Sequence, residues 1–439
     1  MSDPSRQGPC RIVKVRRSWV GTNRVRRSSA IVVLTMLLLG SVAVLQPPQV
    51  VGALPTATTV SAATSQFSLR MLYFARATTI VPATTTTTVT QQPAPLSIHV
   101  VGNHLVNSQG QTLRLIGVNF PGMDVLTPTG QCTTTFGSPH NVGEIDAMVT
   151  WDINAVRIPL NEDCWLGING VSPTMTAAYR ISLQSLVSEL NQRGLYAILD
   201  LHVSAPGTIR AIALQAMPDA DHSPAFWSSV ASTFVNDPAV IFDLFNEPHL
   251  SNVLPQGAND WACWLSGCSI PAIYSKNPGM QQSTSPFIWQ ATGMQQLVNA
   301  VRSTGATQPI MLSGLNYAND VEGWLTHVPV DKLHQLIASV HVYNSDACNT
   351  LTCWDQSYVP LAQQYPVVTA ELGEDDCNDG FIDQYMQFAD ANGISYLGWS
   401  WSIETSCSSP GGAALITNWN GSPSPEGVGL QNHLKALAG

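Results

Sequence analysis

The chain has 439 residues, 44% of them hydrophobic and only 11% charged, which is enough apolar material for one large core. The charge is unevenly distributed. Residues 1–29 carry eight basic side chains and one acid, whereas the chain after residue 96 carries nine basic and 28 acidic side chains. An acidic main body repels nucleic acid and anionic membranes, so the composition excludes both as partners but leaves an uncharged polymer open.

The first 53 residues have the order of an export signal. A basic leader precedes residues 30–45, which are uncharged and mostly apolar, and two prolines follow at 47 and 48. We expect cleavage near Ala53 and hence a secreted, extracellular protein. A leader left uncleaved would be a signal anchor, with the catalytic domain held outside, and only then would the membrane be a partner. Residues 54–95 are rich in Thr, Pro and Ala and predict a disordered linker.

From residue 96 onward, strand-like and helix-like segments alternate. Residues 98–101 and 104–106 flank a Gly-Asn turn and predict a β-hairpin that closes the bottom of a barrel. Eight strands are then expected at 113–119, 154–160, 196–202, 240–246, 309–316, 338–343, 366–371 and 395–401. Strands and helices in alternation predict an α/β fold, a single (β/α)8 TIM barrel over residues 96–439.

Helical spacing supports this alternation. Tyr179, Leu183, Leu186 and Leu190 recur at intervals of three and four, with a Ser-Pro start signal at 172–173 and glycine at 194 as a stop. Similar patterns predict helices over 294–301, 381–388 and 430–437.

Two of the predicted strands end in glutamate. The apolar run from Val240 ends in Asn246, Glu247 and Pro248, and the run from Pro366 ends in Glu371. Parallel barrels place their chemistry at the carboxyl ends of strands, so these carboxylates can face each other across the barrel mouth. Paired carboxylates, one protonated and one ionised, are what glycoside hydrolysis requires.

At these strand ends the sequence resembles glycoside hydrolase family 5, the cellulase family of retaining barrels, over roughly residues 96–439. The resemblance implies that Glu247 is the general acid/base and Glu371 the nucleophile. It also matches six supporting or substrate-binding positions on the strand ends: Arg157, His202, Asn246, His341, Tyr343 and Trp399.

Each supporting residue has a chemical reason to be there. Arg157 and Tyr343 would keep Glu371 ionised, and Asn246 can bond the sugar 2-hydroxyl. Trp399 offers an apolar face to the sugar, and the family implies a cis peptide bond after it. Retention of configuration requires the two carboxyl groups to lie about 5–5.5 Å apart.

The cysteines fit export. Cys10 lies in the leader, and eight more fall between residues 132 and 407, an even number typical of an oxidising compartment. Spacing alone does not fix their connectivity, but we predict Cys132–Cys164, Cys263–Cys268, Cys348–Cys353 and Cys377–Cys407. The sequence lacks the Cys-x-x-Cys and His-Glu-x-x-His spacings of zinc sites, so no metal and no cofactor are expected.

Some residues near these motifs have simpler explanations. Asp243 is assigned to a buried structural hydrogen bond, and Glu374, Asp375 and Asp376 to a solvated acidic loop. Four tryptophans in the loops could be sugar platforms or simply packing: Trp165, Trp261, Trp264 and Trp354.

The expected function is a secreted endo-β-1,4-glucanase (cellulase), a monomer acting on a polysaccharide or oligosaccharide. The same barrel could cleave mannan, β-1,3-glucan or an exo-type substrate, because specificity depends on loops such as residues 249–290. An inactive barrel that only binds polysaccharide is the alternative from another class.

Overall fold

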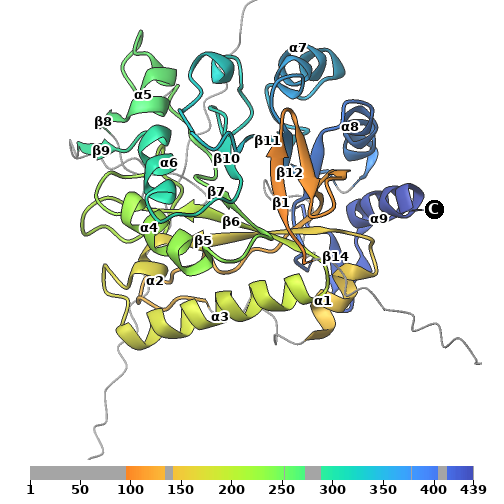
Figure 1. The fold of residues 1–439 in the computed structure, drawn as a ribbon, viewed down its shortest axis with the longest axis horizontal. Helices are drawn as coiled ribbons and strands as arrows, with labels where there is room; N and C mark the ends of the chain where they lie inside the picture. Colours follow the sequence, from red (N-terminus) through yellow and green to blue (C-terminus); the bar gives the residue numbers. More distant parts are fainter. Residues whose placement is uncertain are drawn as a thin grey trace, which may run out of the picture. The chain divides into compact units, whose positions relative to one another are not determined.

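The computed structural model describes residues 95–133, 142–251, 253–271, 288–376, 378–403 and 413–438. The predicted leader, the linker up to residue 94 and the Cys377–Cys407 pair lie outside them. Eight parallel strands form a closed barrel in the order β4, β5, β6, β7, β10, β11, β12 and β13 (Figure 1). Their bounds are Ile116–Asn119, Ala155–Asn161, Tyr196–Val203, Val240–Asp243, Ile310–Ser313, Leu336–Tyr343, Val367–Gly373 and Ser395–Gly398.

All eight predicted barrel strands are present. β6 is buried at each of its eight positions, as expected for a strand covered on both faces. β7, β10 and β13 each end three residues earlier than predicted. Beyond Asp243 the chain leaves the regular ladder, although the amide of Asn246 still donates to the carbonyl of Leu201 at 3.1 Å. Asn246 and Glu247 are thus held beside the barrel rather than in a free loop.

Nine α-helices lie within the described ranges: α1 (Val142–Val149), α2 (Glu162–Leu166), α3 (Pro173–Gln192), α4 (Ser223–Phe234), α5 (Asp260–Ser266), α6 (Met294–Arg302), α7 (Leu351–Ala362), α8 (Gly380–Ala391) and α9 (Pro425–Ala438). α3 begins as predicted, because the side chain of Ser172 accepts a hydrogen bond from the amide of Met175 and proline occupies its first turn. Its predicted core positions are buried. In α9, Leu437 is 46% exposed and is not part of the core. None of the described helices combines the length and the apolar content needed to cross a bilayer.

The alternation of strand and helix is broken once. Between β10 and β11, over residues 314–335, the chain forms only a short 3-10 helix, η1 (Trp324–Thr326). A hollow of about 420 Å³ lies where this connection meets α7. The ring of helices around the barrel is therefore thinner at this point than a regular (β/α)8 pattern predicts.

A small antiparallel sheet closes the amino end of the barrel. It consists of β1 (Ile98–Val101), β2 (His104–Asn107) and β3 (Thr112–Leu113), so the predicted hairpin gains a third strand. Ile98, Val100 and Leu105 belong to one buried cluster with residues from the barrel strands. The side chain of Gln335 accepts from the amide of Val100 at 2.7 Å and donates to its carbonyl at 3.1 Å.

Three predicted disulfides are present in the described ranges, Cys132–Cys164, Cys263–Cys268 and Cys348–Cys353. Two further hairpins lie outside the barrel. One pairs β8 (Cys268–Ile270) with β9 (Trp289–Ala291), and the other pairs β14 (Ile416–Asn418) with β15 (Ser422–Pro423).

Candidate active site

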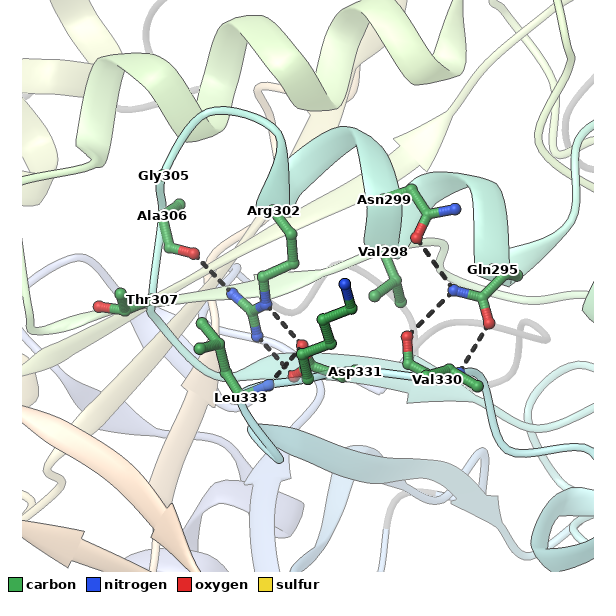
Figure 2. Close-up of a pocket in the computed structure, with 11 residues that line it drawn as sticks. Gln295, Val298, Asn299, Arg302, Gly305, Ala306, Thr307, Val330, Asp331 and Leu333 are labelled. Carbon is green, nitrogen blue, oxygen red and sulfur yellow. Dashed lines mark hydrogen bonds and ion pairs between the residues drawn. The ribbon is translucent and has the colours of Figure 1, made fainter.

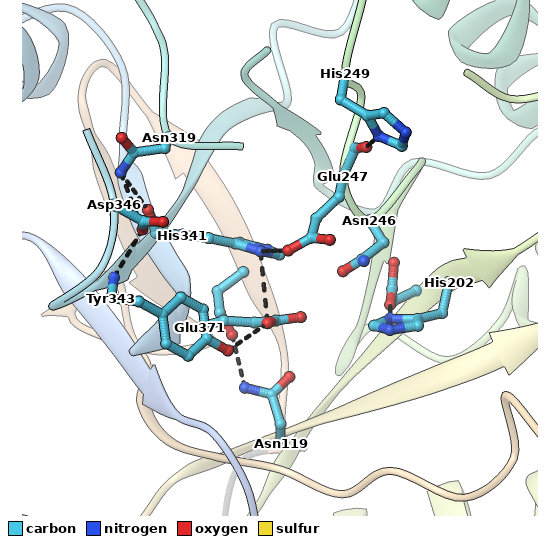
Figure 3. Close-up of polar contacts among 12 residues, drawn as sticks. Asn119, His202, Asn246, Glu247, His249, Asn319, His341, Tyr343, Asp346 and Glu371 are labelled. Atoms are coloured by element: carbon cyan, nitrogen blue, oxygen red, sulfur yellow. Dashed lines mark hydrogen bonds and ion pairs between the residues drawn. The ribbon is translucent and has the colours of Figure 1, made fainter. Parts of the chain in front are cut away.

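The two predicted catalytic carboxylates meet at the carboxyl end of the barrel (Figure 3). Glu371 lies on β12, and Glu247 follows β7. One oxygen of each carboxylate and one ring nitrogen of His341 all lie within 4.8 Å of one another. This spacing agrees with the short separation, about 5–5.5 Å, at which one carboxylate can attack a sugar while the other protonates the leaving oxygen.

Glu371 is held at both of its oxygens. Oε1 accepts a hydrogen bond from Nη1 of Arg157 at 2.9 Å, and Oε2 accepts one from the Tyr343 hydroxyl at 2.6 Å. The side chain is 5% exposed, so these donors replace most of its water. These two donors, one of them a cation, fix the direction of the carboxylate.

Arg157 is the centre of the buried polar network. Its pKa is raised because the carboxylates around it outweigh the effect of burial. Besides Glu371 it contacts Asp243 (2.9 Å), Asn119 (3.1 Å), Asn246 (2.9 Å) and Asp200 (3.0 Å). Asp243 is therefore in the buried hydrogen bond assigned to it, and its partner is the arginine that also holds Glu371.

Glu247 has the opposite environment. Burial is the main reason that its pKa is raised to about 7, although the charges of His202 and Arg157 oppose the shift. Oε1 lies 3.1 Å from Nδ1 of His341, whose own pKa is lowered to about 4 by burial. A neutral imidazole can support Glu247 without forcing it to ionise, so this carboxyl group can keep a proton near neutral pH.

His202 and Trp399 form a wall of the site. Their rings stack with centroids 5.7 Å apart at an angle of 11°, and the peptide bond after Trp399 is cis. Nδ1 of His202 lies 2.7 Å from Oδ2 of Asp200. Burial opposes the charged imidazolium, but the charge and hydrogen bond of Asp200 raise the pKa of His202 to about 9. All eight residues predicted from the strand ends thus lie around one site.

The prediction of a solvated loop at Glu374 is wrong. Glu374 is 3% exposed, and its Oε2 accepts a hydrogen bond from the amide of Phe381 at 2.9 Å. Its own amide donates to Oε1 of Glu426. Glu374 is buried because it fixes the start of α8. The spacing of residues in the sequence does not show this contact. Asp376 is exposed, as predicted.

Three of the four loop tryptophans are packing residues. These three are fully buried: Trp165, Trp264 and Trp354. The indole nitrogen of Trp264 donates to the carbonyl of Ser313, and that of Trp354 donates to the carbonyl of Cys348. The ring of Trp261 packs over Gly323, where an added Cβ would lie 2.4 Å from it. The three buried indoles have no open face for a sugar, whereas Trp261 is partly exposed.

Two groups of side chains in the described ranges could hold a metal ion. One is the carboxylate pair with His341, and the other is Glu162, Asp219 and His222. In the second group the Ser223 hydroxyl donates to Glu162 at 2.7 Å, and Asp219 accepts from the amide of His222 at 2.7 Å. These bonds fix the start of α4, and no metal is needed to explain the arrangement.

A hollow of about 520 Å³ lies far from this chemistry, before β10 and β11, at their amino ends (Figure 2). Arg302 is bonded there to both carboxylate oxygens of Asp331 at 2.9 Å. Gln295 exchanges two hydrogen bonds with the backbone of Val330. Arg302 and Asp331 thus pair with each other, and the hollow contains no pair of carboxylates.

Comparison with known proteins agrees with the geometry. The profile of Cellulase (glycosyl hydrolase family 5) matches residues 117–405. Endoglucanase 1 of Saitozyma flava is 26% identical over 242 residues, which cover 53% of this chain and 60% of that protein. Endoglucanase CelA of Streptomyces lividans is 22% identical over 326 residues, covering 71% and 58%. The chain thus spans about three fifths of the length of these two curated relatives.

Solved structures show the same fold. The beta-glucanase SdGluc5_26A from Saccharophagus degradans superposes with a TM-score of 0.57 at 19% identity, covering 79% of this chain and 95% of that one. The endoglucanase Cel5A of Thermobifida fusca gives a TM-score of 0.52 at 16% identity, covering 77% and 97%. With the profile match over most of the barrel, these findings establish that the chain belongs to the cellulase family, glycosyl hydrolase family 5.

Proposed function

We propose that this protein is an endoglucanase, a retaining glycoside hydrolase that cleaves internal bonds of β-1,4-glucan. The observation that carries the proposal is the contrast between two adjacent carboxyl groups. Glu371 is bonded to a cation and a hydroxyl, whereas burial raises the pKa of Glu247 to about 7. Such a contrast separates a nucleophile from an acid.

The reaction takes two steps. An oxygen of Glu371 attacks the anomeric carbon while Glu247 gives its proton to the departing glycosidic oxygen, which leaves a covalent glycosyl-enzyme. Glu247, now ionised, takes a proton from water as the water attacks the same carbon, and the Glu371–sugar bond breaks. Both proton transfers pass through the same carboxyl group, so its pKa near neutrality suits it to both.

The neighbouring residues have positioning or binding roles in this scheme. Arg157 orients Glu371 and Asn246 together, since it donates to both. The amide of Asn246 is then aimed at the sugar 2-hydroxyl, a contact that strengthens in the transition state. The half-buried ring of Trp399, stacked on His202, offers its other face to the sugar.

The names of the relatives support β-1,4-glucan as the substrate. Those reported above are called endoglucanases, and SdGluc5_26A has been solved in complex with cellotetraose. Cleavage of mannan, β-1,3-glucan or an exo-type substrate would use the same chemistry. The sizes of the products that the protein releases from each substrate distinguish these possibilities from an endo-β-1,4-glucanase.

Export remains part of the proposal. It rests on the basic leader and the apolar run, with the three disulfides in support. Amino-terminal sequencing of protein from the culture medium should find a chain that begins near residue 54. Full-length protein in the membrane fraction would instead indicate a signal anchor.

The direct test is the viscosity of carboxymethylated cellulose, followed by size analysis of the products. The wild-type protein should lower the viscosity quickly, before much reducing sugar appears, and Glu371→Ala should abolish this. Glu189→Ala, on the outer helix α3, is the matched control and should be fully active. Activity retained in Glu371→Ala would refute the proposed mechanism.

A further inference from the structure

The line between the two catalytic carboxylates divides the barrel mouth into two unequal sides. Going round the barrel, β10 and β11 separate β7 from β12 on the short side. On the long side, β13, β4, β5 and β6 lie between β12 and β7. The long side carries Trp399, Arg157 and His202.

The sugar that is attacked belongs on the long side. Asn246, which is expected to bind its 2-hydroxyl, turns toward β5 and bonds to Arg157 at 2.9 Å. In a retaining enzyme the carboxylates flank the bond that breaks, so the leaving part of the substrate must extend over the short side.

Tyr317, just beyond β10, is an exposed aromatic side chain on the short side. It is 38% exposed. Its ring stacks on the ring of His249, with centroids 4.4 Å apart and an angle of 12°. His249 is 4% exposed, and its Nδ1 forms a 2.7 Å hydrogen bond with the carbonyl of Glu247 (Figure 3). One face of the tyrosine is therefore covered by a residue anchored to the catalytic acid.

The backbone that presents Tyr317 is unusual. Asn316, Tyr317 and Ala318 have φ values of 57°, 60° and 62°, although none of them is glycine. Such conformations are unfavourable for residues other than glycine and persist where the surroundings impose them. The loop is fixed on both sides, because the amide of Tyr317 donates to Pro248 (3.1 Å) and the amide of His341 donates to Ala318 (3.0 Å). Both contacts reach segments that carry or support Glu247.

We propose that Tyr317 is the binding platform for the first sugar of the leaving group, and that His249 fixes this platform relative to the general acid. The inference rests on the proposed function. An aromatic ring suits a neutral sugar, since its apolar face can pack against the C–H groups of the sugar. A platform fixed to the backbone of Glu247 keeps the leaving oxygen within reach of the proton that it must receive.

Two substrates separate this role from a general effect on the enzyme. Cellopentaose places sugars on both sides of the broken bond, whereas β-cellobiosyl fluoride carries only fluoride on the leaving side. Tyr317→Ala should lower kcat/KM for cellopentaose at least about tenfold and leave that for the fluoride within about twofold. Tyr317→Phe, which keeps the ring, should remain close to wild type on both.

The outcomes are distinct. Hydrolysis of both substrates by the wild-type enzyme decides the proposed function before any variant is compared, and failure on both would refute the function and the platform together. If Tyr317→Ala loses activity equally on both substrates, the residue is structural and the inference is overturned. Unchanged cleavage of cellopentaose by that variant would also overturn it.

Discussion

The Tyr343 hydroxyl donates a 2.6 Å hydrogen bond to Oε2 of Glu371, the oxygen that Arg157 does not hold. Tyr343→Phe removes this donor and leaves the ring in place. Since hydrogen bonds to charged groups contribute about 1.5–3 kcal/mol, we expect kcat/KM on soluble β-glucan to fall about 10- to 150-fold. Tyr396→Phe, which loses a 3.1 Å bond to Asp390, is the control and should keep its activity. Equal rates in the two variants would contradict the assignment.

The pH profile should report Glu247. Burial raises its pKa to about 7, so the carboxyl group is protonated below that pH and loses its proton above it. Because the acid form gives the proton, kcat/KM on glucan should fall about tenfold per pH unit above about 7. β-Cellobiosyl fluoride needs no proton for its first step, and its kcat/KM should not show this fall. If kcat/KM fell in the same way above about pH 7 on both substrates, a group other than Glu247 would be responsible.

Disulfide removal should have graded effects on stability. Cys132 and Cys164 are 32 positions apart, whereas Cys263 and Cys268 are five apart. Loop-closure entropy predicts losses of about 3.7 and 2.2 kcal/mol in the free energy of unfolding when the pairs are replaced by serine. Urea unfolding of the two double variants measures both. A larger loss from the short loop would mean that local packing, rather than chain entropy, sets the order.

Gln335 should matter for stability but not for catalysis. Its amide exchanges two hydrogen bonds with the backbone of Val100 at the amino end of the barrel. Gln335→Ala leaves both backbone groups without this partner and should cost about 1–3 kcal/mol in the free energy of unfolding, with kcat unchanged. Gln364→Ala, a nearby exposed glutamine that bonds only within its own turn, should cost far less. A change in kcat would show that the two ends of the barrel are coupled.

Strand ends could be predicted because two local signals agree there. A run of apolar residues marks a strand buried on both faces, and a polar residue at its end marks the barrel mouth. This signal predicts Glu247 and Glu371. It also applies to Asn119, which was not assigned to the site although it ends β4 in the same way and bonds to Arg157. Asp200 could also have been found, since it lies two positions before His202 on β6 and therefore faces the same side.

Other features had no local signal. Glu374 lies in a run of acidic residues that is typical of a solvated loop, yet it is buried because a helix starts against it. Tyr317 follows a strand like many loop residues, and its stacking on His249 depends on how the segments after the neighbouring strands β10 and β7 pack together. Which residues contact each other in the folded barrel depends on packing, and the spacing of residues along the chain does not show it.

The sheet at the barrel's amino end also affects the order of folding. Its first strand is made early, but Val100 is bonded to Gln335, which lies 235 positions further along the chain. The apolar face of the hairpin therefore has no complete surface to pack on until most of the barrel has been synthesised. Contacts between such distant residues slow folding, because a long loop must close before they form. A chain that passes through a translocation channel must stay unfolded on the way, and delayed closure of the barrel is compatible with that route.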